Sequence, residues 1–181
     1  INGAWVPRSP GSALKPFTYL LALDKGHTAA AVLDDLPVEY LTPSGNYEPV
    51  NYDRRFRGPV PVRQALAGSL NVPAVRLLDS IGGPPVLHQT LSQKLGFTGL
   101  DPDPGNYGLG LTLGTAEVRL LELTNAYACL ARLGEFRPYR LAKTTQEGSI
   151  GNQTLFDRNT CWILADILSD NRARASQFGL N

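Results

Sequence analysis

Ser12 and Lys15 are the two residues of this sequence best placed to do chemistry together. They lie in the stretch Arg8–Phe17, where a Pro-Gly pair predicts a turn and apolar residues at helical spacing follow it. Ser12 is therefore expected where a turn meets a helix, with Lys15 one helical turn further on the same face. A serine becomes a nucleophile when a base takes its proton, and a lysine whose pKa is lowered by burial can be that base. The same two residues also fit a helix cap followed by a solvated lysine.

A second polar pair, Ser69 and Asn71, lies on a predicted tight connection between two helices. Pro73 cannot continue the first helix, but it suits the first turn of the second. Asn71 is expected to be the N-cap of that second helix, a role compatible with a functional one. Acyl transfer by a serine needs a proton carrier toward the leaving amine and groups that bind the substrate, and a hydroxyl and an amide can supply both.

The spacing Ser-x-Asn occurs three times, at residues 44–46, 69–71 and 169–171. Spacing alone does not choose among them. Local context does, because the middle occurrence lies on a tight connection between helices.

Short helices must position these residues. Helices are expected over residues 12–25, 62–68, 74–78, 85–95, 116–133 and 158–168. Thr115 and Asp157 are the predicted N-caps of the last two helices. The proline- and glycine-rich residues 34–61 are expected to form a long surface loop, as a groove wall or simply solvated, and residues 171–181 a further loop. With two short strands predicted within residues 136–156, the expected class is α+β and mostly helical, with residues 1–181 in a single domain.

The composition of the chain excludes several functions. The chain has 17 basic and 16 acidic residues among 181, for a net charge of +1, and no long charged run. No nucleic-acid or membrane-surface partner is therefore indicated. The sequence has no signal peptide and no apolar stretch long enough to span a membrane. It also has no methionine, so we expect that it is not a complete translation product.

Cys129 and Cys161 each lie in an apolar stretch with helical spacing. Two buried free thiols are favoured over a disulfide, although the sequence alone leaves the disulfide open. His27 and His88 stand alone, and no cysteine or histidine has the spacing of metal ligands, so no metal site is expected.

Together these motifs resemble the transpeptidase domain of penicillin-binding proteins, specifically the class A enzymes of type 1C. The family carries Ser-x-x-Lys, Ser-x-Asn and Lys-Thr/Ser-Gly in this order along the chain. The resemblance runs through nearly the whole chain. It rests on Arg8–Phe17, Tyr47–Asn51, Ala65–Val75, Leu113–Ala128 and Trp162–Leu168.

The resemblance implies a role for each residue of the two polar pairs. Ser12 would be the acylated nucleophile and Lys15 its base. Ser69 would relay the proton toward the leaving group, and Asn71 would bind the amide of the substrate. The implied reaction cross-links peptidoglycan stem peptides at D-Ala-D-Ala, with β-lactams acylating the same serine and with no cofactor. The implied location is the cell envelope, in the periplasm or on the outer face of the cytoplasmic membrane, with membrane attachment through a segment absent from this chain.

The third family motif is missing from the sequence. Lys143 begins a Lys-Thr-Thr that lacks the glycine and precedes the helix expected at 158–168, whereas the family places its motif after that helix. Residues 169–171 spell the Ser-Asp-Asn of β-lactamases, yet they come too late and are expected to be an exposed helix end. We therefore expect the chain to stop before the Lys-Thr-Gly strand, and the family's upstream glycosyltransferase domain is absent as well. The full-length protein is expected to be a D,D-transpeptidase, and the 181-residue piece inactive or nearly so, because losing one oxyanion donor costs about 100- to 1000-fold in rate.

Two other functions fit the same residues. A serine β-lactamase or a D,D-carboxypeptidase would hydrolyse the acyl-enzyme, and a non-catalytic module would sense β-lactams or cell-wall peptides. The preferred stem peptide, the acceptor and the oligomeric state cannot be read from the sequence.

Overall fold

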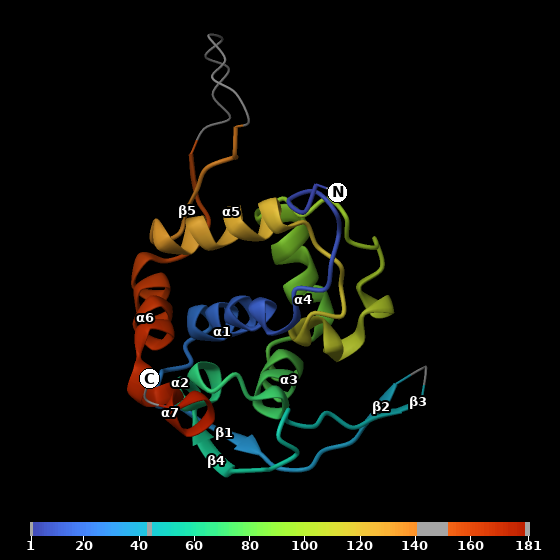
Figure 1. The fold of residues 1–181 in the computed structure, drawn as a ribbon, viewed down its shortest axis with the longest axis vertical. Helices are drawn as coiled ribbons and strands as arrows, with labels where there is room; N and C mark the ends of the chain where they lie inside the picture. The colour runs from blue at the N-terminus through green and yellow to red at the C-terminus, as the bar shows by residue number, and fades with distance from the viewer. Residues whose placement is uncertain (1, 43–44, 141–151, 180–181) are drawn as a thin grey trace.

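A computed structural model describes residues 2–42, 45–140 and 152–179 of the chain (Figure 1). Its architecture is α+β and mostly helical, as predicted. The α-helices are α1 (Lys15–Asp24), α2 (Val62–Ala67), α3 (Asn71–Ser80), α4 (Pro84–Gln89), α5 (Leu120–Ala131), α6 (Arg158–Ser169) and α7 (Asn171–Phe178). Short 3-10 or π-helical segments are η1 (Gly11–Leu14), η2 (Thr90–Lys94), η3 (Pro104–Asn106) and η4 (Gly108–Leu113).

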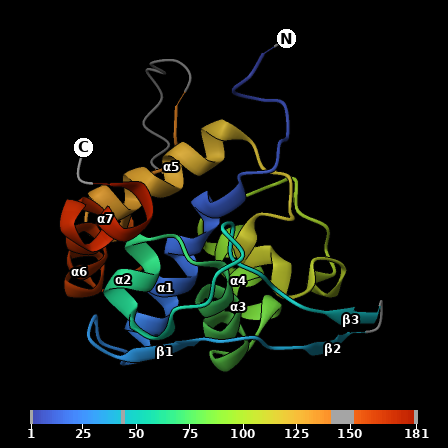
Figure 2. The same cartoon turned by 60° about the horizontal axis from the view of Figure 1, so that its bottom comes forward.

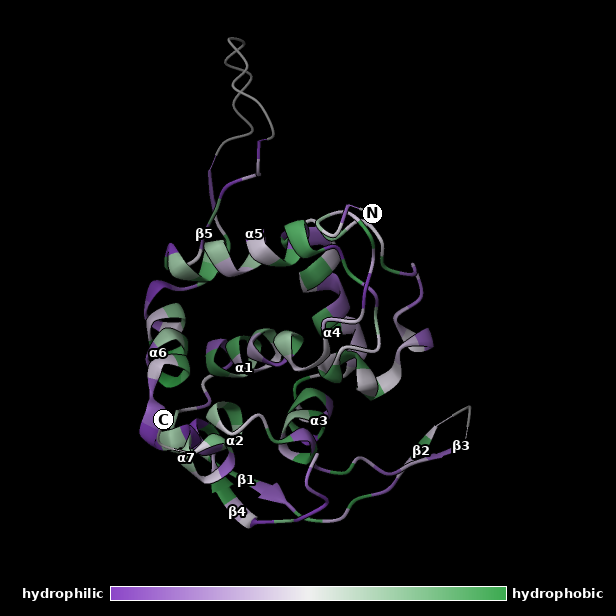
Figure 3. Ribbon diagram, viewed as in Figure 1, coloured by the Kyte–Doolittle hydropathy of each residue, from purple (hydrophilic) through white to green (hydrophobic). Residues whose placement is uncertain are grey.

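Helix α1 forms the centre of the core. Every residue from Lys15 to Leu23 is buried, and α1 packs against α3 and α6. Figure 1 shows the other helices arranged around it, and Figure 3 shows hydrophobic residues gathered on α1, α3 and α5. Burying an apolar side chain such as Phe17 stabilises the fold by about 1.5–3 kcal/mol. Because nearly all of α1 is buried in this way, the helices packed on it are held in place largely by their contacts with α1.

Three two-stranded antiparallel sheets occur among the described residues. They pair β1 (Val32–Asp35) with β4 (Gly58–Pro61), β2 (Tyr40–Thr42) with β3 (Gly45–Tyr47), and β5 (Glu135–Phe136) with β6 (Gln153–Thr154). Figure 2 shows β1 running beneath the helices and the β2–β3 hairpin extending to one side.

The loop predicted over residues 34–61 is therefore wrong. Strands β1 and β4 are four residues each, too short to show an alternating pattern, and their partners are separated by more than twenty residues. Pro59 and Pro61 also argued against a strand at β4, because proline cannot donate a backbone hydrogen bond, although it is tolerated at the edge of a sheet. The pairing buries Val60 and Asp35 beneath the helices.

Helix α5 begins later than predicted. The expected helix over 116–133 with Thr115 as its cap is wrong, because Val118 forms an antiparallel bridge with Arg8. Each of these two residues donates its N–H to the carbonyl of the other, at 3.0 and 2.9 Å. The backbone therefore stays extended up to Arg119, which is the residue before the first turn of α5.

The C-terminal stretch predicted as a loop forms helix α7 instead. Asp170 accepts hydrogen bonds from the N–H groups of Arg172 and Ala173, both at 3.0 Å, and so caps this helix. Gln177 of α7 accepts a 2.5 Å hydrogen bond from the guanidinium of Arg57. The composition of α7 is polar, so its apolar periodicity was too weak to predict a helix.

The start of α6 and the state of the two cysteines were predicted correctly. Helix α6 begins where expected, with the Asp157 carboxylate accepting from two N–H groups of its first turn. Cys129 and Cys161 are free and buried, and burial raises the pKa of the first thiol to about 11 and of the second to about 12.

Lys143 and the two threonines after it lie outside the described residues. Within the described residues, no helix combines the length and the apolar character needed to cross a membrane.

Candidate active site

Ser12 lies on a turn that is held by the close approach of two glycine backbones, Gly11 and Gly114. Gly11 and Gly114 both have positive φ, at 56° and 87°. A Cβ added at Gly114 would lie 2.3–2.5 Å from backbone atoms of Gly11, so no side chain fits there. The Ser9 hydroxyl donates to the Gly114 carbonyl at 2.7 Å. Segment η4, which ends beside Gly114, therefore fixes the position of Ser12.

Two further contacts hold the start of α1. The Tyr127 hydroxyl of α5 donates to the Ala13 carbonyl at 2.9 Å. Inside the core, the hydroxyls of Thr18 and Thr112 are 2.7 Å apart and fully buried. Buried polar groups are costly when unpaired, so these pairs define one relative position of α1, α5 and η4.

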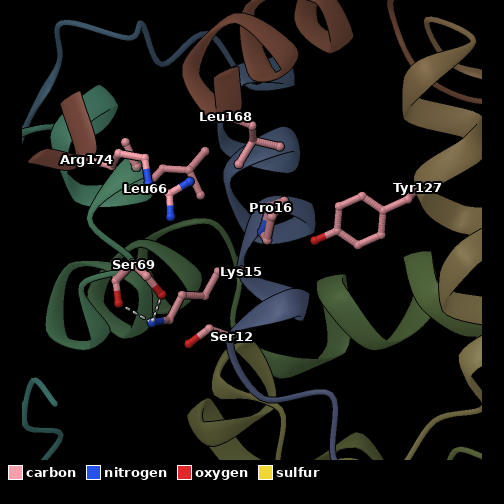
Figure 4. Close-up of a pocket in the computed structure, with 9 residues that line it drawn as sticks. Ser12, Lys15, Pro16, Leu66, Ser69, Tyr127, Leu168 and Arg174 are labelled. Carbon is pink, nitrogen blue, oxygen red and sulfur yellow. Dashed lines mark hydrogen bonds between the residues drawn. The ribbon is translucent and has the colours of Figure 1, made fainter. Parts of the chain in front are cut away.

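Lys15 has its ammonium group inside the molecule. The residue is 1% exposed, and its Nζ donates to the Ser69 carbonyl at 2.5 Å and to Ser69 Oγ at 3.1 Å (Figure 4). It also donates to Asn71 Oδ1 at 2.6 Å. Burial lowers the pKa of Lys15 from 10.5 to about 8, because desolvation disfavours the charged form. Near neutral pH, a minor fraction of Lys15 is therefore unprotonated and able to accept a proton.

The turn that carries Ser69 and Asn71 has a strained backbone. Ser69 has φ 54°, a left-handed conformation that costs a residue other than glycine about 1–3 kcal/mol. Asn71 is the first residue of α3, and Leu70 occupies the N-cap position, so the prediction of Asn71 as N-cap is wrong. The capping oxygen comes instead from Asn51 Oδ1, which accepts from the N–H groups of Asn71 at 2.8 Å and Val72 at 3.3 Å.

Ser12, Lys15 and Ser69 line one hollow of about 200 Å³. Figure 4 shows the three side chains next to one another, with Tyr127 and Arg174 on other parts of the wall. The Ser12 side chain is exposed, and no hydrogen bond to its hydroxyl is found among the described residues. A free hydroxyl beside a buried amine is the arrangement that serine acyl transfer requires, and such contacts often tighten only when substrate is bound.

Comparison with known proteins decides the family. The penicillin binding protein transpeptidase domain matches residues 2–177. The chain belongs to this family. It is 36% identical over 167 residues to penicillin-binding protein 1C of Escherichia coli (strain K12), covering 90% of this chain and 20% of that protein. It is 42% identical over 143 residues to penicillin-binding protein 1A of Aquifex aeolicus (strain VF5), covering 77% of this chain and 19% of that protein.

The fold of this transpeptidase-family chain is also found in solved structures. The PonA1 protein from Mycobacterium tuberculosis, solved in complex with penicillin V, matches with a TM-score of 0.70 and 24% identity. That match covers 92% of this chain and 47% of the other. The resemblance to penicillin-binding proteins of type 1C is confirmed, and the chain spans about one fifth of the length of the curated relatives above.

The described residues of the other two Ser-x-Asn spellings do not line the hollow that holds Ser12. Ser44 is outside the described residues, and Asn46 is exposed in β3. In the third, Asp170 caps α7, and the Ser169 hydroxyl donates to the Asp166 carbonyl at 3.0 Å. Among the described residues, no group of His, Cys, Asp or Glu is arranged to hold a metal ion.

Sequence reasoning missed two residues behind the site, Asp35 and Asn51. Both are buried, and both lie in the segment predicted to be a long surface loop. The one available signal was the position of Asn51 at the end of the stretch Tyr47–Asn51, which carries part of the family resemblance. No periodic pattern marked either residue as buried.

Proposed function

We propose that this chain carries the acylation centre of a D,D-transpeptidase, with Ser12 as the nucleophile and Lys15 as its base. The observation that supports this most is the buried Lys15 Nζ, which is held by Ser69 and Asn71 in the same hollow as the Ser12 hydroxyl. Family membership makes serine acyl transfer the chemistry to expect of this arrangement.

The hydrogen bonds of Lys15 explain how it would act as a base. The Ser69 carbonyl and Asn71 Oδ1 are pure acceptors, so two N–H bonds of a neutral amine would satisfy them and leave the lone pair free. Ser12 Oγ would attack the substrate carbonyl and give its proton to that lone pair. As the C–N bond breaks, Ser69 Oγ, 3.1 Å from Nζ, would give its proton to the leaving nitrogen and take one from Lys15, which returns to the neutral form.

Asn71 has one donor left for a substrate. Its Oδ1 accepts from Lys15, and one hydrogen of its Nδ2 is donated to the Val50 carbonyl at 2.8 Å. The second Nδ2 hydrogen is available for a substrate carbonyl, which is the role proposed for this side chain. Because the amide is fixed at both ends, binding would require little reorganisation.

The proposed substrate is the D-Ala-D-Ala end of a peptidoglycan stem peptide, with β-lactams as acylating analogues. Support comes from the relatives, which are named penicillin-binding proteins, and from the matching PonA1 structure, which was solved in complex with penicillin V. This substrate places the proposed activity in the cell envelope.

The hollow favours a long-lived acyl-enzyme over hydrolysis. None of the described residues that line it is Asp or Glu, so no carboxylate there is positioned to activate water. The sequence contains no Lys-Thr/Ser-Gly, which in the family supplies an oxyanion donor and a cation for the substrate carboxylate. We therefore expect slow acylation by this chain, about 100- to 1000-fold below an intact site, followed by slow deacylation.

Incubation with benzylpenicillin, followed by intact-protein mass spectrometry and peptide mapping, tests the proposal. We expect one adduct per chain, formed over hours on Ser12 and absent from Ser12→Ala. Exposed Ser176 of α7 provides the matched control, since Ser176→Ala should acylate like the parent chain. An adduct on another residue, or none after overnight incubation, would contradict the proposal. An adduct that disappears within minutes would point to a hydrolase instead.

A further inference from the structure

A network of buried, hydrogen-bonded side chains lies behind the Ser69–Asn71 turn. Asp35 at the end of β1 is 0% exposed, and Asn51 is 3% exposed. The Asn51 Nδ2 group donates to both carboxylate oxygens of Asp35, at 2.7 and 2.9 Å, and to the Arg55 carbonyl at 2.8 Å. Asp35 also accepts from the N–H of Arg57 at 2.9 Å. Two residues distant from the nucleophile in sequence are thus fixed by several hydrogen bonds in the interior.

The carboxylate of Asp35 determines which way the Asn51 amide points. An ionised carboxylate accepts hydrogen bonds and donates none, so the NH2 end of Asn51 must face it. Oδ1 of Asn51 is thereby directed to the start of α3, where it accepts from the N–H groups of Asn71 and Val72. These N–H groups have no partner within the helix, so Asn51 supplies a cap from twenty residues away.

This remote cap leaves the Asn71 side chain free for the site. An asparagine at the N-cap position caps a helix with its own oxygen, but Asn71 follows the N-cap residue Leu70, and its Oδ1 accepts from Lys15 at 2.6 Å. Its Nδ2 donates to the carbonyl of Val50, the neighbour of Asn51. Consecutive residues 50 and 51 therefore hold Asn71 by its side chain and by its backbone.

The strain at Ser69 shows why such a support is needed. A residue other than glycine at φ 54° stays in that conformation only when its surroundings fix it. Lys15 binds both the carbonyl and the hydroxyl of Ser69, but Lys15 belongs to the other side of the site. Backbone hydrogen bonds from Ser69 to Leu66 and from Leu70 to Ala65, at 2.9 and 3.0 Å, tie the turn to α2. The Asn51 cap fixes its other end, at the start of α3.

We propose that Asp35 and Asn51 are positioning residues of the acylation centre. Asp35 orients Asn51, Asn51 caps α3, and the capped turn presents Ser69 and Asn71 to Lys15. The catalytic consequence of this inference rests on the proposed function, whereas the support of the turn does not.

Exchanging the two side chains provides a sharp test. In Asn51→Asp, the carboxylate placed at position 51 can still accept from α3, but it faces Asp35 with no proton between them. Two ionised carboxylates so close repel each other, and neither can donate the hydrogen bond that orients position 51. In the double variant Asp35→Asn/Asn51→Asp, the amide placed at position 35 donates to the carboxylate placed at position 51, and the contact re-forms with its polarity reversed.

Acylation of Ser12 by benzylpenicillin is the first readout. At pH 8 we expect Asn51→Asp to acylate about 100-fold more slowly than the parent chain, because small displacements of catalytic groups cost that much. The double variant should return to within about tenfold of the parent. Asn46→Asp, the same change on the exposed strand β3, should match the parent.

Amide hydrogen exchange is the second readout and does not need catalysis. The N–H groups of Asn71 and Val72 report directly on the Asn51 cap, and those of α6 report on the overall fold. We expect faster exchange at Asn71 and Val72 in Asn51→Asp at pH 8, restored protection in the double variant, and unchanged exchange in α6. Unchanged exchange at Asn71 and Val72 would overturn the inference, as would equal acylation by all variants of a reactive parent. A parent that is never acylated would contradict the proposed function, and the exchange data would still decide whether Asp35 and Asn51 support the turn.

Discussion

Two turns in this molecule have the same Ser-x-Asn sequence and use their side chains in opposite ways. Each is followed at once by a helix, α3 after Ser69 and α7 after Ser169. In the second turn, the middle residue Asp170 caps the helix, and the Ser169 hydroxyl donates to a carbonyl of its own helix. The polar groups of that turn are thus largely satisfied locally.

The first turn takes its cap from elsewhere in the fold. Leu70 occupies the N-cap position and has no side-chain oxygen, so the cap comes from Asn51. Ser69 and Asn71 are then free to bind Lys15. The comparison teaches that a helix start becomes available for chemistry when a distant residue satisfies its N–H groups.

Removing the amine that distinguishes the two turns should have the largest effect. We expect Lys15→Met to lower the acylation rate of Ser12 by about 1000-fold or to below detection, because a positioned base contributes about 100- to 10,000-fold. Adduct formation with benzylpenicillin, followed by mass spectrometry, measures it. Lys25→Met removes an amine that follows the same helix and donates to the Ile81 carbonyl, outside the lining of the hollow, and this variant should react like the parent chain. Comparable rates for the two variants would show that Lys15 is not the base.

Truncating the two turns in parallel tests the comparison itself. Ser69→Ala and Asn71→Ala should each slow acylation by about 100-fold, because each removes a group bound to Lys15. Ser169→Ala and Asn171→Ala should stay within about twofold of the parent, since surface changes away from the site have small effects. The same penicillin time course measures all four variants. Similar losses from both turns would remove the distinction drawn here.

A local change at the second turn should give the smallest effect. Asp170→Ala removes the cap of α7 and one partner of Arg63. We expect amide exchange at Arg172 and Ala173 to accelerate several-fold, with acylation of Ser12 unchanged. Hydrogen exchange with mass spectrometry or NMR resolves this. Arg174 of α7 lines the hollow, so a marked loss of acylation would mean that the reaction depends on the position of this helix.

The sequence was sufficient to predict the helices with clear periodicity and the residues that meet at the site. Helix α1 and the start of α6 follow from apolar spacing and capping residues, which are local signals. Residue type, spacing and local context selected Ser12, Lys15, Ser69 and Asn71. In the structure, Lys15 contacts Ser69 and Asn71, and Ser12 lies beside Lys15 and Ser69 in the same hollow. Their catalytic roles remain predictions.

The features that were missed depend on contacts between distant segments. Strand β1 is recognisable only from its pairing with β4, and the start of α5 was displaced by the bridge between Arg8 and Val118. The cap of α3 comes from Asn51, whose burial no pattern in residues 34–61 revealed. Local propensity cannot report such contacts, because tertiary structure creates them.

The dependence of Ser12 acylation on pH tests the central claim most directly. Only neutral Lys15 can take the serine proton, and burial lowers its pKa to about 8. The acylation rate, corrected for spontaneous hydrolysis of benzylpenicillin, should fall about tenfold per pH unit below pH 8 and level off above it, since the neutral fraction behaves in this way. A rate that continues to rise beyond pH 10, as for a solvated lysine, or that stays constant from pH 6 to 9, would contradict the account.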